Sequence, residues 1–98
     1  MELTGRQKRH LRSLAHHLRA LVSIGKSGIT EEVLDQIDAN LLAHELIKVK
    51  LLQSCPADRD ECAGLVAGKT GAVLAQSIGR TLLFYRPHPE KPVIDLPG

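Results

Sequence analysis

The sequence is poor in aromatic residues: its 98 residues include no tryptophan, one phenylalanine and one tyrosine. Extensive stacking of bases on a row of aromatic side chains, as on the sheet of an RNA recognition motif, is therefore excluded. Long hydrophobic runs are also missing, since no window approaches the roughly 18 consecutive apolar residues of a membrane-spanning helix. The first residues lack the apolar centre of a signal peptide, so we expect a cytoplasmic protein with no membrane partner.

Cysteine occurs only at positions 55 and 62, and no second pair or nearby histidine completes a zinc-binding pattern. Among the histidines, His16 and His17 are adjacent, so on a helix they point to different sides and do not form a ligand pair. We therefore expect no metal site and two reduced thiols, although the spacing of Cys55 and Cys62 alone leaves a disulfide open.

Charge is unevenly distributed along the chain. Residues 1–28 carry six Lys or Arg and one acid, a net charge of +5, whereas residues 29–98 carry seven Lys or Arg and ten acids, a net charge of −3. Because concentrated positive charge attracts polyanions, the N-terminal part is where we expect a partner to bind.

The hydrophobic pattern predicts seven elements in the order α-β-α-β-α-β-β. Thr4 and Gln7 form a capping box, Thr30 is a good N-cap for the second helix, and Pro56 and Gly71 suit the start and the end of the third. The sequence thus predicts helices from Thr4 to about Ala20, from Thr30 to about His44 and from Pro56 to Gly71, and strands over 21–24, 45–52, 72–79 and 81–86.

The length permits a single core, so we expect one compact α/β domain over residues 1–86. Four prolines fall between Pro87 and Pro97, which excludes a helix there. Residues 87–98 are predicted to form an extended tail, either along the surface or in solvent.

The predicted first helix has two different faces. Leu11, Leu14, Ala15 and Leu18 recur on one side, and this side should pack. The opposite side is cationic, with Arg9, Arg12, His16 and Arg19, and Arg6 at its edge. Solvated basic residues usually serve solubility alone, but their confinement to one side favours a phosphate-binding surface.

The segment Gly25-Lys26-Ser27-Gly28 lies between the first predicted strand and the second predicted helix. Backbone N–H groups and the helix dipole at such a place favour a bound phosphate, and a GxxG loop clamps the nucleic-acid backbone in KH domains. The alternative is that the glycines only permit a tight turn. Glu31 and Glu32 follow closely and would repel a phosphate unless they point away.

The segment "GLVAGKTG", residues 64–71, superficially resembles a nucleotide-binding P-loop. It has three residues where the Walker pattern needs four, and it ends a predicted helix instead of following a strand. We expect a helix C-terminus with Lys69 on its dipole, and no nucleotide cofactor. No spacing supports a nucleophile with an orienting base, so an enzyme is not expected.

The chain as a whole resembles the CRM domain (chloroplast RNA splicing and ribosome maturation) in its free-standing bacterial YhbY form. The resemblance is carried by "LTGRQKRHLRSLAHHL", "VSIGKSGITEEVL", "HELIKVKLL", "TGAVLAQSIGRTLLFYRP" and "KPVIDLP". It implies a four-stranded mixed sheet with packed helices, similar to the C-terminal domain of translation initiation factor three. It also implies RNA binding by the GxxG loop and nearby basic surface, and association with precursors of the large ribosomal subunit.

Carried over by position, the resemblance assigns RNA binding to the loop and to the "GRQKRHLR" stretch. These residues are Gly25, Lys26, Ser27 and Gly28 in the loop, and Arg6, Lys8, Arg9 and Arg12 in the stretch; Arg19 joins them from the cationic face. The competing hypothesis is a protein-interaction adaptor whose basic first helix docks an acidic partner. Salt-dependent RNA binding separates the two.

Overall fold

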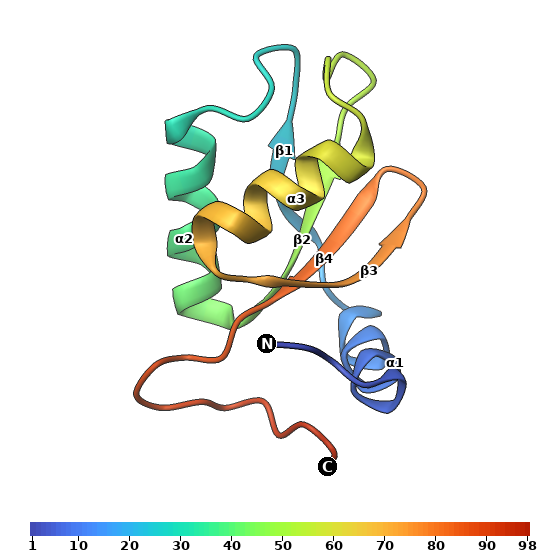
Figure 1. Cartoon of the computed structure of the whole chain (residues 1–98), viewed down its shortest axis with the longest axis vertical. Coiled ribbons are helices and arrows are strands. Elements are labelled where there is room, and N and C mark those ends of the chain that lie inside the picture. Colours follow the sequence, from blue (N-terminus) through green and yellow to red (C-terminus); the bar gives the residue numbers. More distant parts are fainter.

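The computed structural model describes all 98 residues and contains three helices and one four-stranded sheet (Figure 1). The elements follow the predicted α-β-α-β-α-β-β order, and the predicted class of a single compact α/β domain is confirmed. Their bounds are α1 Gly5–Ala15, β1 Ala20–Ile24, α2 Glu31–His44, β2 Leu46–Leu51, α3 Arg59–Thr70, β3 Val73–Ile78 and β4 Thr81–Tyr85.

The sheet is mixed, with strand order β1-β2-β4-β3. The outer strand β1 runs parallel to β2, and the other two pairings are antiparallel. A tight turn at Gly79 and Arg80 joins β3 to β4, as predicted, and Gly79 adopts a φ of 57° there.

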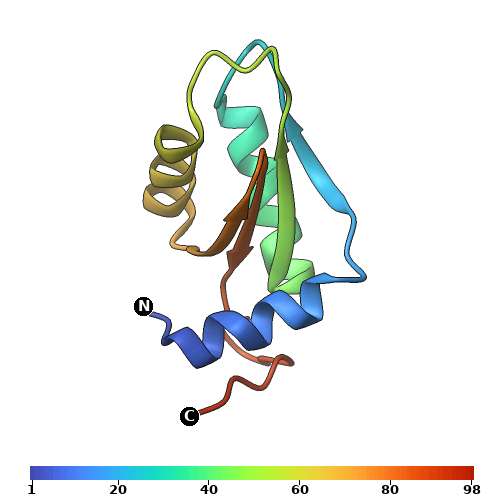
Figure 2. The same cartoon turned by 90° about the vertical axis from the view of Figure 1, so that its right-hand side faces the viewer.

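Alternation along the strands sends side chains to two separate hydrophobic clusters. Ile47, Val49 and Leu51 of β2 join the larger cluster, which α2 and α3 cover. The smaller cluster lies on the other face, beneath α1, and consists of Leu11, Ala15, Leu46, Ala75, Leu83 and Tyr85. Figure 2 shows α1 crossing one end of the sheet rather than covering a whole face. The helices therefore cover one face fully and the other only in part.

The first helix is shorter than the sequence predicted, and the predicted end near Ala20 was wrong. The capping box of Thr4 and Gln7 is present, but α1 ends at Ala15, and the N–H of Leu18 donates to the carbonyl of Ala15 at 3.0 Å in the turn that follows. The chain must turn here because Ala20 pairs with β2. Leu14 and Leu18, predicted to pack, are both exposed.

The third helix also begins later than Pro56. Its N-cap is Asp58, whose carboxylate accepts from the N–H of Glu61 at 2.8 Å, so Pro56 belongs to the preceding loop. The predicted end is confirmed: Gly71 caps the helix with a φ of 74°. The second helix matches its prediction at both ends, from its N-cap Thr30 to His44.

The proline-rich tail lies along the surface, where the buried Glu45 carboxylate holds its first part and the Gln7 side chain donates to the carbonyl of Pro97 at 3.0 Å. Glu45, only 3% exposed, accepts hydrogen bonds from the N–H groups of His88, Val93 and Ile94 at 2.8 to 2.9 Å. Burial by itself raises the pKa of Glu45, but these three donors and the nearby His88 side chain outweigh it and lower the pKa overall. The tail thus completes the packing at the α1 end of the sheet.

Candidate nucleic-acid interface

The 25–28 segment is a hydrogen-bonded turn closed by its two glycines. The N–H of Gly28 donates to the carbonyl of Gly25 at 2.9 Å, and Gly28 adopts a φ of 68°, which favours glycine. Gly28 is also buried, and a Cβ built on it would lie 3.5 Å from Cγ of Pro56. The two glycines therefore have a structural role: their backbones close the turn, and Gly28 adopts the positive φ that the turn requires.

The two central residues of the turn point outward. Lys26 and Ser27 are exposed, and their backbone N–H groups donate to no group of the chain. Consecutive free N–H groups beside a lysine are suited to an anion such as phosphate. The turn is separated from α2 by Ile29 and Thr30, so the helix N-terminus does not start at the turn itself.

The acidic residues behind the turn serve α2. Glu31 and Glu32 occupy its first turn, where negative charge is favourable for the helix dipole. Glu31 also lines a groove with Lys69 and Thr70 of α3, so its side chain faces that helix. The repulsion expected from the sequence is therefore weakened at Glu31.

The basic residues of the N-terminal stretch are all exposed. Arg6, Lys8, Arg9 and Arg12 lie on α1, whereas Arg19 lies in the connection between α1 and β1. The prediction that Arg19 shares a helical face with Arg12 was therefore wrong, because the helix ends four residues earlier. No acidic residue forms an ion pair with any of them, and the only ion pair of the structure joins Arg86 to Asp38.

The turn and α1 do not lie together, although the sequence places them side by side. Both views show the turn between β1 and α2 at the top of the molecule and α1 at the bottom (Figures 1 and 2). They are joined by β1, whose five residues span about 16 Å. The interface predicted from the sequence therefore consists of two basic regions at opposite ends of one sheet.

Two further lysines occupy the sheet between these regions. Lys48 and Lys50 of β2 lie on the face opposite the larger cluster, and Lys50 is exposed. In the segment "IKVKL" the lysines alternate with apolar residues, which is typical of a strand whose lysines point away from the core, but this alternation does not indicate what the lysines face. Their position follows only from the pairing of β2 with β1 and β4.

The sequence pattern of CRS1/YhbY (CRM) domains matches residues 3–86. The chain belongs to this family. Among curated relatives, "Probable RNA-binding protein YqeI" of Bacillus subtilis is 42% identical over 97% of this chain and 99% of its own length. A Haemophilus influenzae protein named "RNA-binding protein" is 40% identical, over 97% of this chain and 95% of its own length.

A solved structure is also similar to this CRM domain. The solution structure of a hypothetical protein from Staphylococcus aureus superposes with a TM-score of 0.81 at 45% identity, covering 98% of this chain and all of the other. The alignment thus extends beyond the matched residues 3–86 and includes nearly all of the tail.

Outside the basic regions, the candidate chemical groups of this CRM domain have structural roles. Cys55 and Cys62 are free and buried with their sulfurs 3.8 Å apart; burial, and then the Cys55 thiol, raise the pKa of Cys62 to about 11. The P-loop-like segment forms the last turns and the cap of α3. No three His, Cys, Asp or Glu side chains are grouped to hold a metal ion, and none of the helices is long and apolar enough to cross a membrane.

Proposed function

We propose that this CRM domain is a non-catalytic RNA-binding protein that associates with precursor large ribosomal subunits during their assembly. The 25–28 turn forms one contact region and the basic residues of α1, with Arg19, form the other. The contacts are made to RNA phosphates, so recognition depends on backbone and shape more than on base sequence.

The observation that carries this proposal is the set of unpaired cations in the N-terminal part. Each of these Lys and Arg side chains is exposed and none is neutralised by an acid of the chain; the set is Arg6, Lys8, Arg9, Arg12, Arg19 and Lys26. Cations held in ion pairs would have to give up a partner before binding phosphate. These six are free to displace counterions from the RNA, which is a large favourable term in binding.

The turn adds directional contacts to this charge. A phosphate placed over residues 26 and 27 would accept from their two backbone N–H groups while the Lys26 ammonium neutralises it. The names of the Bacillus and Haemophilus relatives support RNA as the partner. The resemblance to the bacterial YhbY form supports the assembly of the large subunit as the setting.

A protein-interaction adaptor is the second candidate, and one observation favours it. Leu14 and Leu18 are exposed beside His17 and Arg19 in a groove of about 550 Å³ near the end of α1. An amphipathic acidic segment would match such a groove. In this case the basic residues would contact carboxylates of a protein and no RNA.

Crosslinking in cells tests the proposal and separates the two candidates. The protein is crosslinked with ultraviolet light, purified under denaturing conditions, and its attached RNA is sequenced, while a parallel extract is fractionated by sedimentation. We expect fragments of large-subunit ribosomal RNA and co-sedimentation with subunit precursors. Crosslinking of the chain to another protein, with no attached RNA, would favour the adaptor. Attached RNA that does not come from the large ribosomal subunit would contradict the ribosomal assignment.

A further inference from the structure

Part of one sheet face is left open between the two basic regions. On the α1 side, the helix and the tail bury Leu46, Leu83 and Tyr85 at one end of the sheet. Towards the 25–28 turn the same face carries Ser23, Lys50 and Ile78, which are all exposed. Side chains on this face alternate with those of the larger cluster, so the open part is a surface of β1, β2, β4 and β3 that no helix covers.

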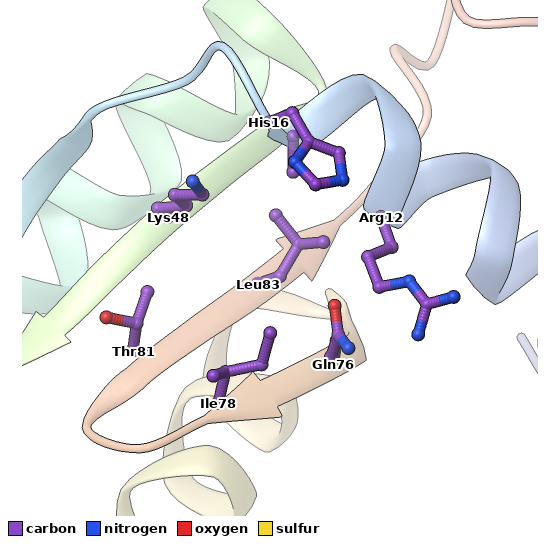
Figure 3. A pocket seen from close by; sticks show the side chains of 8 residues that line it. Arg12, His16, Lys48, Gln76, Ile78, Thr81 and Leu83 are labelled. Carbon is purple, nitrogen blue, oxygen red and sulfur yellow. The ribbon is translucent and has the colours of Figure 1, made fainter.

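A small pocket marks the border between α1 and this open face (Figure 3). Arg12 reaches it from α1, Lys48 reaches it from β2, and His16 reaches it from the cap position directly after α1. His16 keeps a helical backbone conformation, so it lies on the same side as Arg12, four residues earlier. The other lining residues are Ala15, Gln76, Ile78, Thr81 and Leu83, so no acidic residue is present. The pocket has a volume of about 90 Å³.

The size and the charge of the pocket define what it can hold. Sites for drug-sized ligands have volumes of about 300–1,000 Å³, so this pocket is too small for a whole nucleotide. Most of its exposed lining is apolar, and the cations Arg12 and Lys48 are the groups that favour one anionic group there. Lys48 donates to the carbonyl of Leu18 at 3.1 Å, which places its ammonium at the α1 end of the sheet. An ammonium has three N–H donors, so two remain for a phosphate.

The positive charge continues from this pocket towards the turn. Lys50 lies two residues farther along β2, or about 7 Å, and it pairs in register with Ser23 of β1. One residue after Ser23, β1 ends at Ile24, and the 25–28 turn with Lys26 follows. Arg80 also lies at this end of the sheet, but its guanidinium already donates to the carbonyls of Leu51 and Leu52.

We propose that the open face is a track for a single RNA strand, with one phosphate in the pocket of Arg12, His16 and Lys48 and the next contact at Lys50. The strand joins the two basic regions of the proposed function, on which this inference rests. RNA is favoured as the occupant because the pocket presents cations without acids and the lysines continue in a line. With no aromatic residue on the open part, the contacts are to the backbone and independent of sequence.

Three lysine substitutions in the full chain test the track. Lys48→Gln and Lys50→Gln remove charges on the open face, and Lys69→Gln is the matched control in the last turn of α3, where it lines a groove with Asp35 and Asp38 of α2. Lys50 is the cleanest position, because its side chain is exposed and forms no ion pair, whereas the Lys48 ammonium donates to the carbonyl of Leu18. The probe is a single-stranded oligouridylate, and thermal melting checks that each variant is folded.

We expect Lys50→Gln and Lys48→Gln each to weaken oligouridylate binding about three- to tenfold and to reduce the magnitude of the salt slope by about 0.7. Lys69→Gln should bind like the unmodified protein. In spectra of the ¹⁵N-labelled chain, the probe should shift amide signals of β2, β4 and β3 together with those of the turn.

The outcomes distinguish this inference from the proposed function. Wild-type binding by folded Lys50→Gln, with weakened binding by Lys26→Ala, would overturn the track and leave RNA binding by the turn intact. Binding of a structured RNA without any binding of oligouridylate would also overturn the single-strand track. Failure of the unmodified protein to bind either RNA would contradict the proposed function itself.

Discussion

The N–H of Gly28 donates to the carbonyl of Gly25 at 2.9 Å, and this bond closes the turn that carries Lys26 and Ser27. The N–H group of Gly28 is thus not available to a bound phosphate. The glycines therefore shape the turn, and the two residues between them are the ones available for contacts. This division of roles can be tested residue by residue.

Replacing Gly28 with alanine should destabilise the fold. A residue with a Cβ at a φ of 68° is strained by roughly 1–2 kcal/mol, and its Cβ would also lie against Pro56. A loss of this size lowers the melting temperature of a domain this small by about 4–16 °C. The measurement is a thermal melt followed by circular dichroism.

Gly25→Ala is the matched control for that experiment. Gly25 does not have a positive φ, and its added Cβ would meet Leu52 and Ser54 at ordinary contact distances of 3.6 and 3.7 Å. We expect a much smaller change in melting temperature. Equal melting temperatures for the two variants would show that the positive φ of Gly28 is not what requires glycine.

Replacing Lys26 with alanine should weaken RNA binding without affecting stability, because the side chain is exposed and has no partner in the chain. The loss of one phosphate contact should reduce the magnitude of the salt slope for structured RNA by about one. Fluorescence anisotropy over a range of salt concentrations measures both effects. An unchanged slope with normal melting would exclude Lys26 from the interface.

The double substitution Arg9→Gln and Arg12→Gln should lower affinity for all RNAs by similar factors. Both arginines are exposed on α1, and phosphate contacts carry no direct sequence information. Competition binding with several unrelated RNA sequences of equal length measures the factors. A loss confined to one sequence would instead show that these arginines read bases.

Acid should release the C-terminal tail before the rest of the fold. The pKa of Glu45 is lower in the folded chain than in the unfolded one, so its contribution to stability is present above its ordinary pKa of about 4.3 and is lost as the pH falls through the lower folded value. The protection factors of the Val93 and Ile94 amides, which correct the exchange rate for its intrinsic dependence on pH, should fall over that pH range.

Glu45→Gln provides the control at neutral pH. The variant loses the charge and keeps only one of the two acceptor oxygens, which in Glu45 accept from His88 and from Val93 and Ile94 separately, so the tail amides should exchange faster at pH 7 and depend less on acid. Equal protection of Val93 in the variant and the unmodified protein would show that the Glu45 carboxylate does not hold the tail.

Local signals in the sequence were sufficient for most of the fold. The capping box at Thr4, the cap at Thr30 and the glycine at position 71 each depend on neighbouring residues only, and each was predicted correctly. The end of α1 was not, because apolar spacing continues to Leu18 while strand pairing requires a turn before Ala20. The pairing of β1 with β2 is a long-range interaction, and the spacing of apolar residues along the chain carries no information about it.

The candidate site was predictable only in part, because it too depends on long-range interactions. The exposed turn and the basic helix were identified from residue types, but their placement at opposite ends of β1 depends on the path of the chain. Glu45 gave no signal at all, since its partners lie more than forty residues away and are backbone groups. The pocket of Arg12, His16 and Lys48 likewise combines two elements that only the fold brings together.

The most direct test of the account is the salt dependence of RNA binding by the unmodified chain. If four or five of the free cations contact phosphates, the logarithm of the binding constant should fall with the logarithm of salt concentration at a slope of about −3 to −5. A fourfold rise in salt should then weaken binding about 10²- to 10³-fold. Affinity that stays constant over that range would contradict a phosphate-dominated interface.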